Sequence, residues 1–273
     1  MGVGQLTGAT LRWLDDWGRY WRFIWRVVVH GVLSWPAGRA SSLRDRVSVQ
    51  MYEIGNRSVP VVMITGGFVG MTLAVQSFSQ FEGVGLQDRL GSLINISVVK
   101  ELGPVLAAMM LAGRVGGALT AELGTMRVTE QIDALRAMGT DPIKYLVVPR
   151  FLACMILTPF LTVYADVMGV LGGYAITVWY FGVNSEAYWR FSAQVVERWD
   201  LFIGLAKGLF FGGSIALISC YKGFHCEPGA RGVGKACTEA FVGSFLSILV
   251  LDFVLAVIFK GIYEAVYGFR MLV

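Results

Sequence analysis

Charged side chains are scarce in this sequence. Only 15% of its 273 residues are Asp, Glu, Lys or Arg, whereas soluble domains carry about a quarter. Hydrophobic residues make up 55%, and the mean hydropathy is +0.61. This composition excludes an ordinary soluble domain and indicates a membrane protein. No apolar run follows a basic start before Trp13, so we expect no secretory signal peptide.

The common signatures of catalytic and metal sites are missing as well. Its four cysteines form no Cys-x-x-Cys pair and match no common zinc framework. Gly-x-Ser-x-Gly and His-Glu-x-x-His are absent, so hydrolytic chemistry has no support. The stretch GARGVGKA (Gly229–Ala236) has the spacing of a phosphate-binding loop, but Ala236 replaces the magnesium-binding Ser or Thr and no apolar strand precedes it. We expect this chain to be no enzyme and to hold no metal or cofactor, with ATP and Mg²⁺ bound by a separate subunit.

Apolar residues instead form five long blocks. A helix needs roughly 20 residues to cross the hydrocarbon layer of a membrane, and the blocks at 59–80, 93–120, 151–174, 201–221 and 241–262 meet this requirement. The third block could extend to Phe181, and Pro149 and Pro159 could kink or tilt it. The sequence thus predicts an all-α integral membrane protein, with an interfacial segment at residues 1–57 and a membrane domain at residues 58–273.

Basic residues are distributed unevenly around these blocks. Eight Lys or Arg lie before the first block, four after the second and three after the fourth, and these fifteen compare with four on the opposite side. Positive residues gather on the cytoplasmic side of membrane proteins. We therefore expect a cytoplasmic N-terminus and a periplasmic C-terminus. The formal net charge of +4 follows from this topology and gives no reason to expect nucleic-acid binding.

Tryptophan recurs before the first block. Trp13, Trp17, Trp21 and Trp25 are four residues apart, which places them along one side of a helix, and arginines fall mainly on its other faces. This pattern is typical of an amphipathic helix that lies in the membrane interface. A helix packed against a partner protein is the alternative.

Glycines recur at four-residue spacing within the blocks, and this spacing predicts close helix packing. The pairs and triplet are Gly66 with Gly70, Gly113 with Gly117, Gly169 with Gly173, and Gly204 with Gly208 and Gly212.

Charged side chains interrupt the apolar blocks, among them Lys100, Glu101, Arg114, Asp166, Lys207 and Asp252. Ionisable residues inside a membrane are costly, which makes each one a candidate functional residue. Lys207 could pair with Asp166 or Asp252, either as a structural ion pair or as part of a proton relay.

Lys100 and Glu101 are neighbours, so their side chains point about 100° apart on a helix and do not simply neutralise each other. They lie about two turns from the outer end of the second block. Pro104 removes one backbone hydrogen bond just beyond them.

These residues open a stretch that resembles the signature of the MlaE-type permeases: KELGPVLAAMMLAGRVGGALTAELGTMRVTEQIDALRAMGTDPIKYLVVPRF, Lys100 to Phe151. Such permeases are the membrane subunits of ABC transporters that work with MCE proteins in lipid traffic between membranes. The resemblance extends from GGFVGM (Gly66–Met71) to LDFVLA (Leu251–Ala256) and includes the GARGVGKAC loop. Lys100 stands where relatives often carry Arg, which keeps the charge but gives up bidentate phosphate geometry.

The resemblance implies a homodimer in the bacterial inner membrane, with cytoplasmic ABC ATPase subunits beneath it and a periplasmic MCE-domain lipid-binding protein on its outer face. It also implies a phospholipid pocket at the dimer interface. The segment 122–138 is similar to the family's cytoplasmic coupling element, which makes four residues candidates for ATPase coupling: Arg127, Glu130, Asp133 and Arg136.

We hypothesise that Lys100 and Glu101 line an outward-opening lipid cavity and bind the head group, because a zwitterionic phospholipid offers both an ammonium and a phosphate. Leu73, Phe81 and Leu102 are candidates for the wall around the acyl chains.

Two alternatives remain open. One is a secondary lipid transporter coupled to protons through Asp166, Lys207 and Asp252. The other is a membrane scaffold that anchors an MCE assembly without moving lipid itself.

Overall fold

The computed structural model describes residues 18–30 and 40–267, and within these ranges the chain forms helices and turns without a β-strand. Five helical segments are long and apolar enough to cross a membrane: Leu43–Glu82, Gln87–Val128, Ile143–Tyr180, Arg198–Phe224 and Ala230–Val266. The predicted all-α fold with five spans is confirmed. Every helical segment extends past its apolar block, because a helix continues where the hydrocarbon layer ends and its last turns are polar.

The described helices follow one another along the chain, and two of them, α6 and α8, lie between spans. The helices from Ala40 onward are α2 (Ala40–Glu82), α3 (Leu90–Ser97), α4 (Gly103–Leu111), α5 (Gly117–Val128), α6 (Gln131–Ala137), α7 (Val148–Tyr174), α8 (Ser185–Val195), α9 (Arg198–Phe224) and α10 (Ala230–Tyr267). Helices α3, α4 and α5 together form the second span. The third span continues as a π-helical turn to Tyr180, and it accommodates Pro149 in its first turn and Pro159 in its interior.

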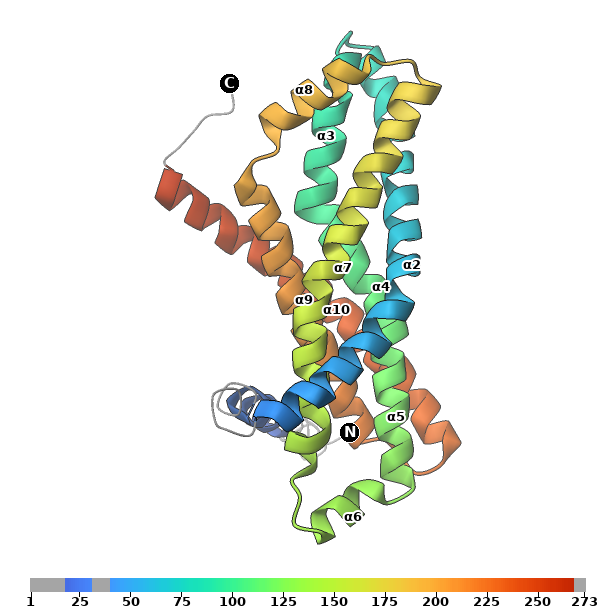
Figure 1. Cartoon of the computed structure of the whole chain (residues 1–273), viewed down its shortest axis with the longest axis vertical. Helices are drawn as coiled ribbons and strands as arrows, with labels where there is room; N and C mark the ends of the chain where they lie inside the picture. Colours follow the sequence, from blue (N-terminus) through green and yellow to red (C-terminus); the bar gives the residue numbers. More distant parts are fainter. Residues whose placement is uncertain (1–17, 31–39, 268–273) are drawn as a thin grey trace, which may run out of the picture.

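The two ends of the bundle differ. Helix α6 and the turn between α9 and α10 lie at one end, whereas α8 and the loop between α2 and α3 lie at the other (Figure 1). The helix at residues 18–30 lies at the α6 end, where its Phe23 packs against the rings of Tyr221 and Phe224. The basic segments that the charge distribution assigns to one side of the membrane are therefore gathered at one end of the described structure.

The helix at residues 18–30 has a buried face and an exposed face. Phe23 and Val27 are buried, whereas Trp21 and Trp25 on the other face are 59% and 72% exposed. Trp13 and Trp17 lie outside the described residues. Burial, with a second contribution from Tyr221, raises the pKa of Tyr20 to about 12, so its phenol is neutral. The interfacial placement of this helix stays a prediction.

Helices α2 and α7 approach each other through glycines. A Cβ atom at Gly70 would lie 1.8 Å from the carbonyl oxygen of Gly169, and one at Gly66 would lie 2.4 Å from that of Ala165. No other residue fits at these distances, so this small-residue spacing does set a close helix contact. A Cβ at Gly117, in contrast, would have no neighbour within 4 Å.

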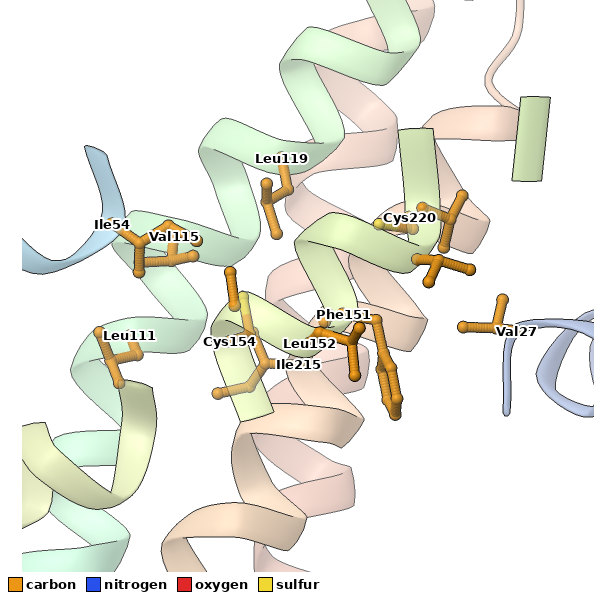
Figure 2. Packing of buried hydrophobic residues seen from close by; sticks show 14 of the residues in the cluster. Val27, Ile54, Leu111, Val115, Leu119, Phe151, Leu152, Cys154, Ile215 and Cys220 are labelled. Carbon is orange, nitrogen blue, oxygen red and sulfur yellow. The ribbon is translucent and has the colours of Figure 1, made fainter. Parts of the chain in front are cut away.

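The main apolar cluster lies where α7 and α9 meet the second span. Figure 2 shows Phe151, Leu152 and Cys154 of α7 packed with Ile215 and Cys220 of α9. In a membrane such contacts stabilise by dispersion and close packing, since lipid tails are as apolar as the side chains. All four cysteines are free thiols. Outside the spans, burial raises the pKa of the Cys226 thiol, which donates to the Gly124 carbonyl at 3.5 Å.

Candidate functional site

Three charged residues within the second apolar block lie on π-helical turns. Lys100 and Glu101 belong to the turn Val98–Leu102, and Arg114 belongs to the turn Ala112–Gly116. In the first of these turns the Gly103 N–H donates to the carbonyl of Val98, five residues back. Such turns insert an extra residue into a helix and occur frequently at functional sites.

This insertion redirects the side chains that follow it. The proline at position 104, which lacks an N–H, is the second residue after the turn. Lys100 lies about three turns from the start of α3 at Leu90, so the pair is deeper in its helix than the two turns that the apolar block predicted. Both side chains reach α9, where each finds a partner of opposite charge.

Glu101 pairs with a buried lysine. The Nζ atom of Lys207 lies 2.5 Å from Oε2 of Glu101 and 2.8 Å from Oδ1 of Asp252, and the Lys207 side chain is completely buried. The contact with Asp252 is a charge contact without hydrogen-bond geometry. A buried ammonium is stable only when it is paired. Of the two partners that the sequence suggested for Lys207, the structure selects Asp252, and it adds Glu101.

Lys100 pairs with the start of α9. Its Nζ atom lies 3.2 Å from Oδ1 of Asp200, whose side chain is buried. The other carboxylate oxygen of Asp200 accepts the Glu197 N–H at 3.0 Å, as part of a capping box at the helix N-terminus. Sequence reasoning missed Asp200 because it lies one residue before the predicted fourth block. The Glu-x-x-Asp spacing before that block is the signal that would have indicated a helix start here.

These side chains form one polar cluster with an excess of negative charge. Two cations, Lys100 and Lys207, meet three carboxylates, Glu101, Asp200 and Asp252, for a formal charge of −1. The Lys100 and Glu101 side chains are 40% and 43% exposed, whereas their direct partners are buried. The cluster thus presents one cation and one carboxylate on adjacent residues, and each is paired with a buried residue of α9.

Asp166 stands apart from this cluster. Its side chain is buried on α7, and its Oδ1 atom has no hydrogen-bond partner in the described part of the chain. The carboxylate packs against Gly103, where a Cβ atom would lie 1.7 Å from Oδ1. Within residues 18–30 and 40–267, no hydrogen bond or ion pair joins Asp166 to Lys207 or Asp252.

The three apolar candidates lie near the same π-helical turn. Leu73 and Phe81 of α2 are partly buried and pack against a cluster that includes Ile94 and Val98. Leu102 is the last residue of the turn and is also partly buried. Their proposed contact with acyl chains stays a prediction.

The predicted coupling segment forms a helical hairpin. Helix α5 ends at Val128, Glu130 adopts the left-handed conformation with φ of 59°, and α6 follows. This conformation is uncommon for a residue other than glycine. Asp133 joins the two helices, since its carboxylate lies 2.6 Å from Nη1 of Arg127 and 2.8 Å from Nη1 of Arg136. All three side chains are exposed, and α6, which carries Asp133 and Arg136, is the outermost helix of this end (Figure 1).

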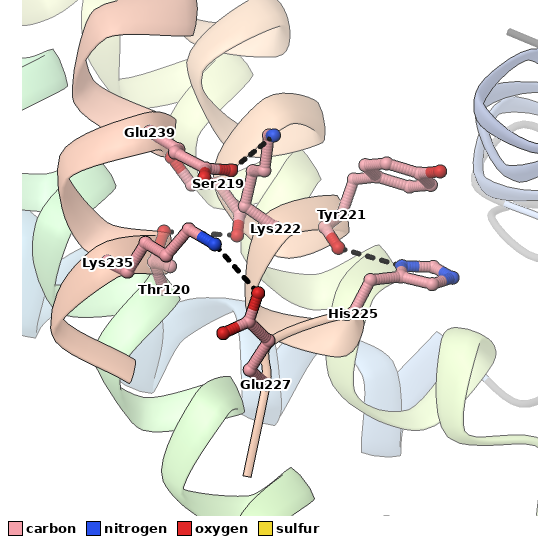
Figure 3. A network of polar contacts seen from close by, with 8 residues as sticks. All are labelled: Thr120, Ser219, Tyr221, Lys222, His225, Glu227, Lys235 and Glu239. Atoms are coloured by element: carbon pink, nitrogen blue, oxygen red, sulfur yellow. Dashed lines mark hydrogen bonds and ion pairs between the residues drawn. The ribbon is translucent and has the colours of Figure 1, made fainter. Parts of the chain in front are cut away.

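The GARGVGKA stretch forms no phosphate loop in the structure. It begins α10, and the element before it is helix α9. Lys235 Nζ lies 2.7 Å from Oε1 of Glu227, and Lys222 Nζ lies 2.7 Å from Oε2 of Glu239 (Figure 3). The lysine that would contact a nucleotide is therefore paired with a carboxylate in the connection between α9 and α10. In the described ranges, no group of three or more His, Cys, Asp or Glu side chains could hold a metal ion.

Known proteins resemble this chain over most of its length. The Permease MlaE family matches residues 47–258. The chain is 43% identical over 210 residues to a "Probable ABC transporter permease protein" of Rickettsia prowazekii, which covers 77% of this chain and 81% of that protein. It is 35% identical over 213 residues to the "Intermembrane phospholipid transport system permease protein MlaE" of Haemophilus influenzae, which covers 78% of this chain and 82% of that protein. With its apolar spans and its charged cluster, the chain belongs to the MlaE permease family.

Proposed function

We propose that this chain is the membrane permease subunit of an ABC transporter that moves phospholipid between the inner and outer membranes of a bacterium. A partner ATPase would supply the energy, and a periplasmic MCE-domain protein would exchange lipid with the permease. Support comes from the family, from the similarity to the phospholipid transport permease of Haemophilus and from the five apolar spans.

The proposal rests mainly on one observation: Lys100 and Glu101 are adjacent residues, and both of their side chains are partly exposed. A zwitterionic head group carries a phosphate and an ammonium, and these match a cation and a carboxylate at one depth. The buried partners Asp200 and Lys207 hold both side chains in place. In a single copy of the chain, about 40% of the surface of each of these two side chains is exposed. A second copy of the chain would supply the opposite wall of a lipid cavity, which agrees with the proposed homodimer.

The proposed orientation connects this site to ATP hydrolysis. With the N-terminus in the cytoplasm, the hairpin of α5 and α6 faces the ATPase, and the cluster around Glu101 lies toward the periplasmic half of the bundle. A movement of α6 caused by the ATPase would then act on the span that carries the head-group site, because α3, α4 and α5 form one continuous span without a loop between them.

Reconstitution tests the proposed function. The permease, its ATPase and its MCE partner are placed in vesicles of phosphatidylethanolamine and phosphatidylglycerol, and the transfer of labelled phospholipid to acceptor vesicles is measured. We expect transfer to require ATP and to be unaffected by a pH gradient. Transfer driven by the gradient without ATP would support a proton-coupled carrier, and lipid binding without any transfer would support a scaffold.

We expect Asp133→Arg to uncouple the ATPase while the membrane fold is retained. The change removes both ion pairs of Asp133 and places three arginines together on the hairpin. Exposed ion pairs contribute less than about 1 kcal/mol to folding, so the melting temperature should change little. Stimulation of ATP hydrolysis by the assembled permease is the measurement, and it should be largely lost. The matched control is Asp88→Arg, the same exposed charge reversal at the opposite end; normal stimulation by the Asp133 variant would refute the coupling assignment.

A further inference from the structure

Arg114 carries a charge that no carboxylate balances in the structure. Its Nη1 atom donates to the Ile54 carbonyl at 3.2 Å and to the Ser58 hydroxyl, both of which are neutral. Among the residues that the structure describes, no Asp or Glu oxygen lies within 4.0 Å of its guanidinium. An arginine inside a span normally has a partner or faces a water-filled cavity.

A groove of about 610 Å³ adjoins this arginine. Its walls are residues 48–57 of α2 and residues 114–122 of the second span. Arg57 lies on the same groove and is a like-charged neighbour of Arg114. Of the two acidic residues there, Glu122 is already paired with Arg150 at 3.0 Å. The other, Glu53, forms no ion pair among the described residues, so two guanidinium groups face one unpaired carboxylate, and this excess of one positive charge suits an anion.

The lining of the groove is both polar and apolar. Polar side chains such as Gln50 and Asn56 share the lining with apolar ones on both walls, and the apolar ones are Val49, Tyr52 and Ile54 of α2 and Val115, Ala118 and Leu119 of the second span. An anion with an apolar tail fits such a lining better than a small inorganic ion does, because the apolar side chains then also find a partner.

The groove lies where the head groups of one membrane leaflet are expected. Arg57 is two residues before the first apolar block, and Arg114 lies six residues before the inner end of the second. With the proposed orientation, this is the cytoplasmic leaflet. Arginine side chains at such a depth bind phosphates, since the planar guanidinium matches phosphate oxygens bidentately.

The groove also lies along the boundary between α2 and the second span, and the cluster of Lys100 and Glu101 lies further along the same span. Further along α2 and α4, a void of about 10 Å³ is lined by Gly66, Val98, Gly103 and Met110. Val98 begins the π-helical turn that carries Lys100 and Glu101, and Arg114 lies on the other π-helical turn of this span. Both charged turns of the second span thus adjoin the same boundary with α2.

We propose that this groove is a second phospholipid site, in which Arg57 and Arg114 bind the phosphate of a lipid from the cytoplasmic leaflet. The proposal rests on the proposed function and adds a site at the opposite end of the second span from the cluster of Lys100 and Glu101. Arg114 is also held to α2 through Ile54 and Ser58, so lipid bound here contacts the joint between the first two spans.

Photocrosslinking in the full-length permease tests this site. Benzoylphenylalanine replaces Ala118, which is exposed on the groove wall, in vesicles that contain ³²P-labelled phosphatidylglycerol. Light should attach labelled lipid to the chain in the absence of ATP. We expect Arg57→Glu to lower the yield about tenfold, as for the loss of a charge-assisted hydrogen bond. Arg44→Glu, the same change at an exposed position of α2 outside the groove, should leave the yield unchanged.

Two results would overturn the proposal. One is a crosslink to a second copy of the chain in place of lipid, which would make the groove a protein contact. The other is a lipid yield that is equal in the parent and the Arg57→Glu variant. Arg57 makes no side-chain hydrogen bond or ion pair within the described chain, so its variant tests binding without loss of the α2 contact that Arg114 makes. ATP-dependent transfer by the parent with no crosslink would refute this site alone, whereas an arginine-dependent crosslink without transfer would refute the transport function alone.

Discussion

Lys207→Met is expected to destabilise the permease by about 3–5 kcal/mol, the usual cost of removing one partner of a buried ion pair. The lysine is completely buried and lies within 2.8 Å of two carboxylates, Glu101 and Asp252. Without the ammonium, these two like charges face each other in the low dielectric of the bundle, and neither has another cation at ion-pair distance in the described structure. The melting temperature of the purified permease in detergent is the measurement.

Two further variants separate this effect from a loss of side-chain packing. Lys260→Met makes the same change at an exposed position of α10 and should leave the melting temperature close to that of the parent. Lys207→Met combined with Glu101→Gln and Asp252→Asn removes all three charges, and it should recover most of the lost stability while transport stays absent. If Lys207→Met alone is as stable as the parent, the charges do not hold α9 against the second span and α10.

Glu101→Gln is expected to lower lipid transport strongly and leave the fold intact. Lys207 keeps Asp252 at 2.8 Å after this change, so no buried charge is left without a partner. The formal charge of the cluster rises from −1 to 0, since the excess carboxylate is the one removed. Its side chain is 43% exposed, which limits the stability change to about 1 kcal/mol. Transport and copurified phospholipid should both fall at least about tenfold, because a charge-assisted bond to the head-group ammonium is lost.

Stability and bound lipid have to be measured on the same preparation. Mass spectrometry of the copurified lipid gives the occupancy, and thermal unfolding gives the stability. Glu82→Gln, an exposed carboxylate at the end of α2, is the control for a change of net charge. A Glu101→Gln variant that is markedly destabilised yet carries its normal lipid would identify Glu101 as a structural residue and would contradict the head-group hypothesis.

Sequence reasoning identified the charged residues of the cluster better than their partners. Ionisable residues within apolar blocks are conspicuous, so Lys100, Glu101 and Lys207 were all candidates. The pairing of Glu101 with Lys207 joins residues 106 positions apart, and no local pattern encodes such a contact. The π-helical turn that directs Glu101 toward α9 had only one local sign, the proline at position 104.

The sequence by itself determined the number of spans, and it contains the signature from which residues 122–138 are proposed as the ATPase-coupling element. Both inferences depend on local properties: a run of apolar residues long enough for the hydrocarbon layer, and the signature from Lys100 to Phe151. Only the tertiary structure decided which charges meet, that Asp166 stands apart from the cluster, and that the groove beside Arg114 exists. Those features depend on how α2, α7, α9 and α10 pack against the second span, and that packing follows from close contacts such as the one between Gly70 and Gly169. A few tenths of an ångström at such a contact decide which side chains lie within hydrogen-bond distance, and periodicity along one helix does not contain that information.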